Sequence, residues 1–140
     1  MLIAQYIYHF GKVTPAAPAM IDDGRSISYG AFAGAISRTG TEISACNVQS
    51  SGTVAVMIRN LADCWVITLA LQAKGYTTIS ISSLQSLESL QVKNLVALFV
   101  KVEEKDDALE HYDSVPVFAL SKPSFEDAAP LENATFAEIS

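Results

Sequence analysis

VAVMIRN, residues 54–60, is the stretch that decides the expected fold. Its apolar part shows no alternation of apolar and polar residues, which is typical of a strand covered on both faces of a parallel sheet. Asn60 suits the N-cap of a helix over residues 61–74, and Asp63 in its first turn favours the positive end of the helix dipole. Because ligands bind at the carboxyl ends of parallel strands, the turn Arg59–Asn60 is either a ligand contact or only a helix start.

The sequence after this stretch continues to alternate between strand and helix signals. Gly75 is a typical stop for the preceding helix. An amphipathic helix is expected over residues 82–94, with a capping box between Ser82 and Gln85, and a charged loop or short helix over residues 103–114. Three further strands are expected, over residues 76–82, 95–102 and 115–120.

The sequence before this stretch predicts a short helix, a hairpin and a longer helix. The short helix covers residues 4–12, and Asp23-Gly24 between two strand-like runs is a strong hairpin signal. Ser28 is a plausible N-cap for the longer helix. Four residues of that helix share one face, which indicates the side that packs on the core: Phe32, Ile36, Thr39 and Ile43.

This order of elements predicts an α/β fold with a doubly wound, mainly parallel sheet, helices on both faces and a β-hairpin in front. The strand-like residues 135–140 have no turn or helix behind them, so we expect an incomplete N-terminal portion of a larger domain. The expected division is a lead-in helix and loop over 1–18, the hairpin over 19–28, the α/β core over 29–120 and a tail over 121–140.

The charge distribution argues against nucleic acid as a partner. The net charge is −6, and residues 103–140 hold ten acids but only two lysines. No basic stripe appears in the rest of the chain. The acidic end is therefore expected to be a solvated surface.

The cysteine content and the apolar runs indicate a cytoplasmic protein that is not in a membrane. Cys46 and Cys64 match no zinc pattern, and no secretory signal precedes them. We expect two free thiols in a reducing compartment, with Cys64 a small core residue. The longest apolar run, residues 61–73, is too short to span a bilayer.

The sequence offers no catalytic, cofactor-binding or metal-binding residue that we would assign. It has neither a glycine-rich phosphate loop nor a G-x-S-x-G nucleophile elbow. His9 lies in a terminal segment and His111 in an acidic loop, so both are expected to be incidental surface residues. The serines of residues 80–89 suit helix caps and a helix surface.

The adjacent acids Asp22 and Asp23 have two interpretations. Such a pair at the end of a strand can hold Mg²⁺, as in response-regulator receiver domains, which share a flavodoxin-like sheet. A receiver also needs an acceptor aspartate after its central strand, where this chain has Ile58, Arg59 and Asn60. The hairpin interpretation is therefore favoured.

Residues 14–100 resemble the N-terminal part of the adenylate-forming ligases, which include acyl-CoA synthetases, aryl-CoA ligases and nonribosomal adenylation domains. PAAPAMIDDGRSISYGAF, residues 15–32, resembles the hairpin and helix start of the family. GTVAVMIRNLADCWVITLALQAKGYTTISIS, residues 52–82, resembles its valine strand, the following Asn, the apolar helix and the Gly before the next strand. The chain departs from the pattern at Thr53, where the family has Asp, and at Ser80, Ser82 and Ser83, where it has prolines. These departures leave the subfamily open.

The resemblance implies a parent enzyme that joins a carboxylic acid to a thiol. A carboxylate attacks the α-phosphate of ATP·Mg²⁺, and coenzyme A or a carrier protein then takes the acyl group from the adenylate. The phosphate loop and the catalytic residues of the family come later than residue 140, so the chain is expected to hold no cofactor. We therefore expect the isolated chain to be an inactive scaffold that lacks the remainder of the ligase and self-associates. The alternative is a stand-alone flavodoxin-like binding module, such as a degenerate receiver domain.

Overall fold

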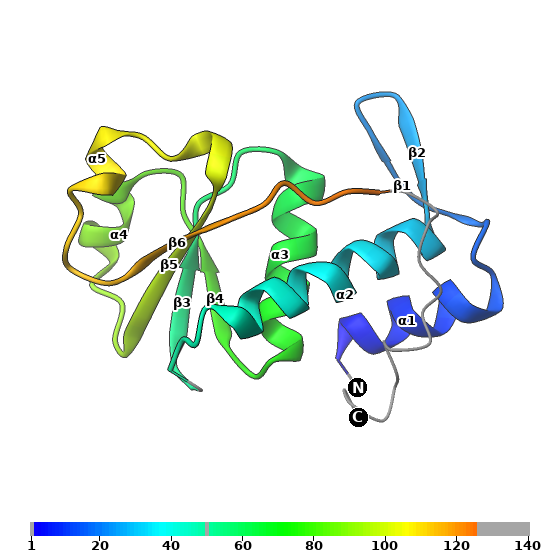
Figure 1. The fold of residues 1–140 in the computed structure, drawn as a ribbon, viewed down its shortest axis with the longest axis horizontal. Helices are drawn as coiled ribbons and strands as arrows, with labels where there is room; N and C mark the ends of the chain where they lie inside the picture. Colours follow the sequence, from blue (N-terminus) through cyan, green and yellow to red (C-terminus); the bar gives the residue numbers. More distant parts are fainter. Residues whose placement is uncertain (1, 50, 126–140) are drawn as a thin grey trace.

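Val54, Ala55 and Val56 form the centre of a four-stranded parallel sheet (Figure 1). A computed structural model describes residues 2–49 and 51–125. Its helices and strands are α1 (Ile3–Val13), β1 (Pro18–Asp22), β2 (Arg25–Ser28), α2 (Tyr29–Ala45), β3 (Thr53–Val56), α3 (Leu61–Ala73), β4 (Thr77–Ser80), α4 (Leu84–Leu90), β5 (Leu95–Lys101), the 3-10 turn η1 (Val102–Glu104), α5 (Asp107–Glu110) and β6 (Val117–Leu120).

The strand order of the sheet is β4-β3-β5-β6, and each neighbouring pair is parallel. From β3 the chain moves to one side to form β4, and it then crosses back to form β5 on the other side of β3. The order therefore reverses between β3 and β5, which is the point where open α/β sheets bind ligands. The expected α/β fold class is confirmed.

Two hydrophobic cores cover the two faces of the sheet. Figure 1 shows α2 and α3 on one side of the sheet and α4 and α5 on the other. Val54 and Val56 face the first core, which also contains buried residues of α1, α2 and α3. Ala55 faces the second core, together with Leu87 of α4 and Leu109 of α5. This burial on both faces explains why the VAV stretch is apolar without alternation.

The antiparallel hairpin of β1 and β2 forms a separate two-stranded sheet. Asp23 and Gly24 make its two-residue turn, with φ values of 52° and 75°. Both values are positive, as a type I′ turn requires. The predicted hairpin is confirmed, and Figure 1 shows it standing away from the four-stranded sheet.

The predicted N-caps Ser28 of α2 and Asn60 of α3 are confirmed, and the predicted N-cap Ser82 of α4 is wrong. The Ser28 hydroxyl accepts the N–H of Ala31 at α2, as expected. At α4 the cap is Ser83, whose hydroxyl accepts the N–H of Ser86 at 3.1 Å. Ser82 lies one residue too early, and the third helical position is Ser86, so no capping box with Gln85 forms.

The predicted face of α2 is confirmed. Its four residues Phe32, Ile36, Thr39 and Ile43 are all buried. The strand expected over residues 135–140 lies outside the described residues. No described helix is long and apolar enough to cross a membrane.

Candidate functional site

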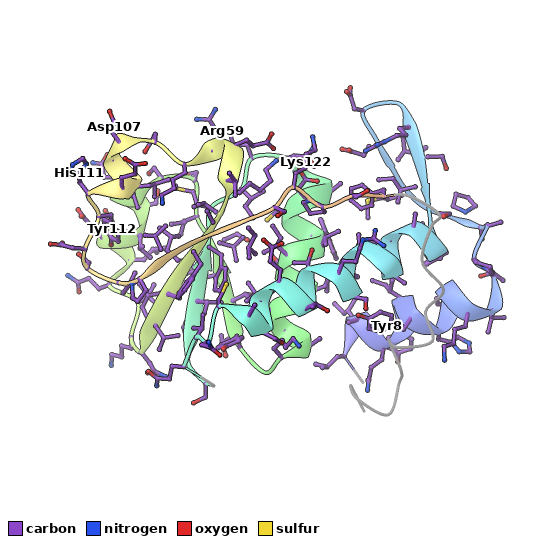
Figure 2. The ribbon with its side chains drawn as sticks, viewed as in Figure 1. Tyr8, Arg59, Asp107, His111, Tyr112 and Lys122 are labelled. Atoms are coloured by element: carbon purple, nitrogen blue, oxygen red, sulfur yellow. The ribbon has the colours of Figure 1, made fainter. Side chains whose placement is uncertain are left out.

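A crevice of about 770 Å³ lies at the carboxyl edge of the sheet, where the strand order reverses. The loops that follow three adjacent strands line it: Met57–Arg59 after β3, Ile81–Ser83 after β4 and Glu103–Asp106 after β5. Apolar residues of α4 and α5 complete the wall. Figure 2 shows Arg59, Asp107 and His111 at this end of the molecule.

The turn Arg59–Asn60 serves both as a helix start and as a wall of the crevice. Asn60 is the N-cap of α3, and its side-chain oxygen accepts the N–H of Asp63 at 2.8 Å. The main-chain N–H of Arg59 donates to Oε1 of Glu104 at 3.0 Å. That bond ties the loop after β3 to the loop after β5, so the two sides of the crevice are fixed relative to each other.

A buried ion pair joins the end of β5 to the first turn of α3 next to the crevice. Lys101, the last residue of β5, is 4% exposed, and Asp63 in the first turn of α3 is 1% exposed. Nζ of Lys101 lies 2.7 Å from Oδ2 of Asp63 and 2.9 Å from Oε1 of Glu103. The sequence predicted Asp63 only as a helix-dipole residue. Its partner is 38 residues away, and no local pattern announces such a pair.

The ion pair changes the proton affinity of its members. Burial alone acts to lower the pKa of Lys101, but the hydrogen bonds to Asp63 and Glu103 outweigh it and raise that pKa above its ordinary value. The same contact with Lys101 lowers the pKa of Glu103. Lys101 is therefore held in its charged form inside the protein.

Three acids around the crevice each have one oxygen in contact with another group of the protein. Glu103 pairs with Lys101, Oε1 of Glu104 accepts the Arg59 N–H, and Asp106 accepts the Leu109 N–H at 3.0 Å. Oε2 of Glu104 is buried and has no hydrogen-bond partner among the described residues.

The cations at the mouth of the crevice are not engaged in this way. Arg59 and Lys105 form no ion pair with any other residue in the described part of the chain. Both side chains are exposed. Arg59 and Lys105 therefore offer unpaired positive charge to an anionic group at the mouth.

The acid pair Asp22–Asp23 lies on the hairpin and not at the carboxyl edge of the parallel sheet. Asp22 lies 3.5 Å from Arg25 and accepts a weak hydrogen bond from Asn60 at 3.4 Å. Residues 2–49 and 51–125 contain no group of three His, Cys, Asp or Glu that could hold a metal ion. The receiver interpretation, which needs the pair at a strand end of the main sheet, is not supported.

The remaining sequence candidates also lie apart from the crevice or have structural contacts. His9 packs edge-on against Phe10, and Nδ1 of His111 lies 2.8 Å from the Asp107 carbonyl oxygen. Cys64 is half-buried against the first core, with Sγ 3.8 Å from the Thr68 hydroxyl. Burial, and secondly the charge of Glu42, raise the pKa of the Cys46 thiol, so that thiol is a poor nucleophile.

Two comparisons of the sequence with known proteins give no match. No family model matches it. No curated protein matches it either.

Solved structures do match. An O-succinylbenzoate coenzyme A synthetase (MenE) from Bacillus subtilis, in complex with AMP, is 18% identical and superposes with a TM-score of 0.68 over 89% of this chain. The N-terminal subdomain of NpsA from Klebsiella oxytoca, in complex with 3-hydroxybenzoyl-AMSN, is also 18% identical and has a TM-score of 0.68 over 86%. The chain has the fold of an adenylate-forming ligase subdomain. At this level of identity the likeness establishes the fold and nothing finer.

The ligase fold is matched only over part of those structures. The chain spans 34% of the synthetase structure and 30% of the NpsA structure, about a third of each. The same synthetase has been solved with ATP and magnesium ion, and with an acyl-adenylate intermediate. The resemblance that the sequence shows to the N-terminal part of these ligases is thus confirmed in three dimensions.

Proposed function

We propose that this chain is the N-terminal scaffold of an ATP-dependent, AMP-forming ligase that joins a carboxylic acid to the thiol of coenzyme A or of a carrier protein. The observation that carries the proposal is the match of nearly the whole chain to about a third of such a synthetase. The crevice adds support, because Arg59 and Lys105 at its mouth suit the anionic reactants of this reaction class.

ATP and Mg²⁺ belong to the parent enzyme in this proposal and not to these residues. The described residues contain no group of three His, Cys, Asp or Glu that could hold a metal ion, so the acids of the crevice do not fit a magnesium site by themselves. The chain also has no glycine-rich loop to hold phosphates. The expected role of this part is to position and support residues that other parts of the ligase supply.

The remaining parts of the proposal follow from this role. The isolated chain should neither bind ATP tightly nor form an acyl-adenylate. We place the protein in the cytoplasm, where its two free cysteines stay reduced. The division into a lead-in over 1–18, a hairpin over 19–28, a core over 29–120 and a tail over 121–140 stays part of the proposal.

The reading frame after Ser140 provides the first test. We expect a Ser/Thr/Gly-rich loop followed by Pro-Lys within about fifteen residues, a window that typical loop lengths allow. The second test is ATP–pyrophosphate exchange with a panel of carboxylic acids, which the longer polypeptide should catalyse and residues 1–140 should not. A reading frame that continues without such a loop would count against the proposal, as would exchange catalysed by residues 1–140 alone.

The stand-alone binding module is the alternative. The crevice at the switch point is compatible with it, because such crevices bind ligands in many open α/β proteins. It predicts a stop codon near Ser140 and a protein that melts cooperatively by itself. The two proposals are therefore separated by the same reading frame.

A further inference from the structure

An apolar groove of about 240 Å³ separates the hairpin from the first turns of α3. Leu61, Ala62 and Trp65 of α3 line it on one side, the four residues Ala19–Asp22 of β1 line it on the other, and Phe32 of α2 completes the lining. Side chains of a strand alternate between its two faces, so the four consecutive residues that line the groove belong to both faces of β1. The groove therefore follows the edge of β1.

This edge of β1 has free hydrogen-bonding groups. Among the described residues β1 pairs only with β2. In a two-residue hairpin the pair that closes the turn, here Asp22 and Arg25, exchanges both main-chain hydrogen bonds, so the next pair, Ile21 and Ser26, exchanges none. The N–H and C=O of Ile21 therefore point away from β2, and no other described residue bonds to this main chain.

Large apolar side chains surround the same groove. Ile21 is 78% exposed, Leu61 is 70% exposed and Trp65 is 46% exposed. Exposed clusters of this kind mark interaction sites, and Trp is enriched among residues that dominate binding. The groove is smaller than the roughly 300 Å³ at which small-molecule sites begin, so it suits one large side chain better than a nucleotide.

The charge around the groove is negative at one end. Asp22 lines the groove and Asp23 follows it at the hairpin tip. Arg25 lies 3.5 Å from Asp22, while Asp23 forms no ion pair with another described residue. The occupant that fits is an extended segment with one large apolar side chain and a Lys or Arg toward the hairpin tip.

We propose that an extended segment of the longer ligase polypeptide adds to the free edge of β1 as a third strand. Its main chain bonds to Ile21, and its apolar side chain lies between Leu61 and Trp65. A lone strand fits better than the sheet edge of a second copy, because α3 borders the groove on the far side. The inference rests on the proposed function, since about two-thirds of the matched synthetase structure lies outside the span of this chain.

Amide hydrogen exchange of Ile21 tests the proposal directly. In residues 1–140 this amide should exchange fast, because no described residue accepts a hydrogen bond from it. In the longer polypeptide encoded by the continuous reading frame, exchange should slow by at least about 100-fold, as expected for a main-chain bond in a stable sheet. The amide of Met20, which faces β2, serves as the internal control, and its exchange rate should change much less.

A pair of variants separates docking from general stability. Trp65→Ser removes one wall of the groove. Exchange of the Ile21 amide in the longer polypeptide should then become at least about tenfold faster, because the docked segment loses an aromatic contact. Tyr6→Ser removes a side chain of similar exposure, 51%, on α1 and away from the groove, and should leave exchange at Ile21 unchanged. Both variants should leave the melting temperature of residues 1–140 nearly as it is.

Several outcomes would overturn the proposal. Unchanged exchange at Ile21 in a longer polypeptide that still catalyses ATP–pyrophosphate exchange refutes the docking but leaves the proposed function standing. Slow exchange without that activity refutes the function and leaves the docking standing. Slow exchange in residues 1–140 that depends on protein concentration assigns the groove to a second copy, and a reading frame that ends at Ser140 removes the proposed segment altogether.

Discussion

At the scale of single residues, the contact that most constrains the crevice is the one between Lys101 and Asp63. Both groups are almost fully buried, and their charges satisfy each other. Removal of one partner from such a pair leaves an uncompensated charge inside the protein. The pair joins β5 to α3, so it also holds the loops after β3 and β5 in register.

Asp63→Leu is the first predicted change. It should lower the free energy of unfolding by about 3 kcal/mol, the lower end for a broken buried pair, because Lys101 keeps only the half-exposed Glu103 as a counter-ion. The double variant Asp63→Leu with Lys101→Met should recover most of that loss. Urea denaturation measures both, and a double variant as unstable as the single one would contradict the ion-pair explanation.

The pH dependence of the free energy of unfolding should also depend on the contacts of Lys101. The pKa of Glu103 is lowered in the folded state, so its contribution is present above its unfolded pKa and is lost as the pH falls through the folded value. The pKa of Lys101 is raised, so its contribution is complete below its unfolded pKa and is lost as the pH rises through the folded value. The stability of the double variant Asp63→Leu with Lys101→Met, which removes the pair without leaving either charge buried alone, should therefore vary less than that of wild type at both the acid and the alkaline end, measured by urea midpoints across pH.

Asn60 provides a separate prediction at the same scale. Asn60→Ala removes the acceptor for the Asp63 N–H and should lower the free energy of unfolding by about 1 kcal/mol, as at other N-caps. Asn60→Ser keeps a capping oxygen and should lose much less. Equal losses in urea titrations of the two variants would show that the cap is not what Asn60 supplies.

At the scale of elements, the start of β3 depends on a glycine. Gly52 has a φ of +131°, and a Cβ there would lie 2.7 Å from Cγ1 of Val96. Gly75 after α3 also has a positive φ, +97°, but open space around it. The two glycines therefore share backbone strain and differ in steric contact.

Gly52→Ala should accordingly cost more stability than Gly75→Ala. The strain of a positive φ is of order 1–3 kcal/mol at each site. The clash with Val96 should add at least about 1 kcal/mol at Gly52 only, as overpacking typically does. Thermal and urea unfolding of both variants measure the difference, and equal effects would rule out the steric part.

The elements themselves were largely predictable from sequence, for local reasons. The valines of β3, the Asp-Gly turn and the caps at Ser28 and Asn60 act within a few residues of themselves. The shift of the α4 cap from Ser82 to Ser83 shows the limit, because two adjacent serines offer the same chemistry.

The candidate site was much less predictable. Sequence placed a possible contact at Arg59–Asn60, but the crevice also needs Ser82, Glu104 and Lys105, which come from two other loops. The Lys101–Asp63 pair and the groove beside β1 likewise join distant segments. Only the topology of the sheet and hairpin brings such residues together.

At the scale of the whole molecule, exposed apolar residues should cause self-association. Ile3, Tyr6, Phe10 and Val13 follow one another at helical spacing on α1, and all are exposed. The groove residues add a second exposed cluster. These two clusters are larger than the single, scattered apolar side chains that are usual on the surface of a monomer.

Residues 1–140 should therefore form dimers or larger oligomers as their concentration rises. The double variant Ile3→Lys with Val13→Lys should lower the apparent mass, because charges on α1 oppose the burial of its apolar stripe. Ile21→Lys, which alters the groove and not α1, should have a smaller effect. Light scattering over a range of concentrations measures all three proteins, and a monomer at every concentration would contradict the prediction.

The strand order has a consequence for synthesis on the ribosome. Val56 pairs with Phe99, which lies 99 − 56 = 43 residues later in the chain. At a synthesis rate of about 5–20 residues per second, β5 is made roughly 2–9 seconds after β3. During that interval at least one edge of β3, whose last three residues are apolar, is unpaired, so nascent chains should depend on chaperones until β5 emerges.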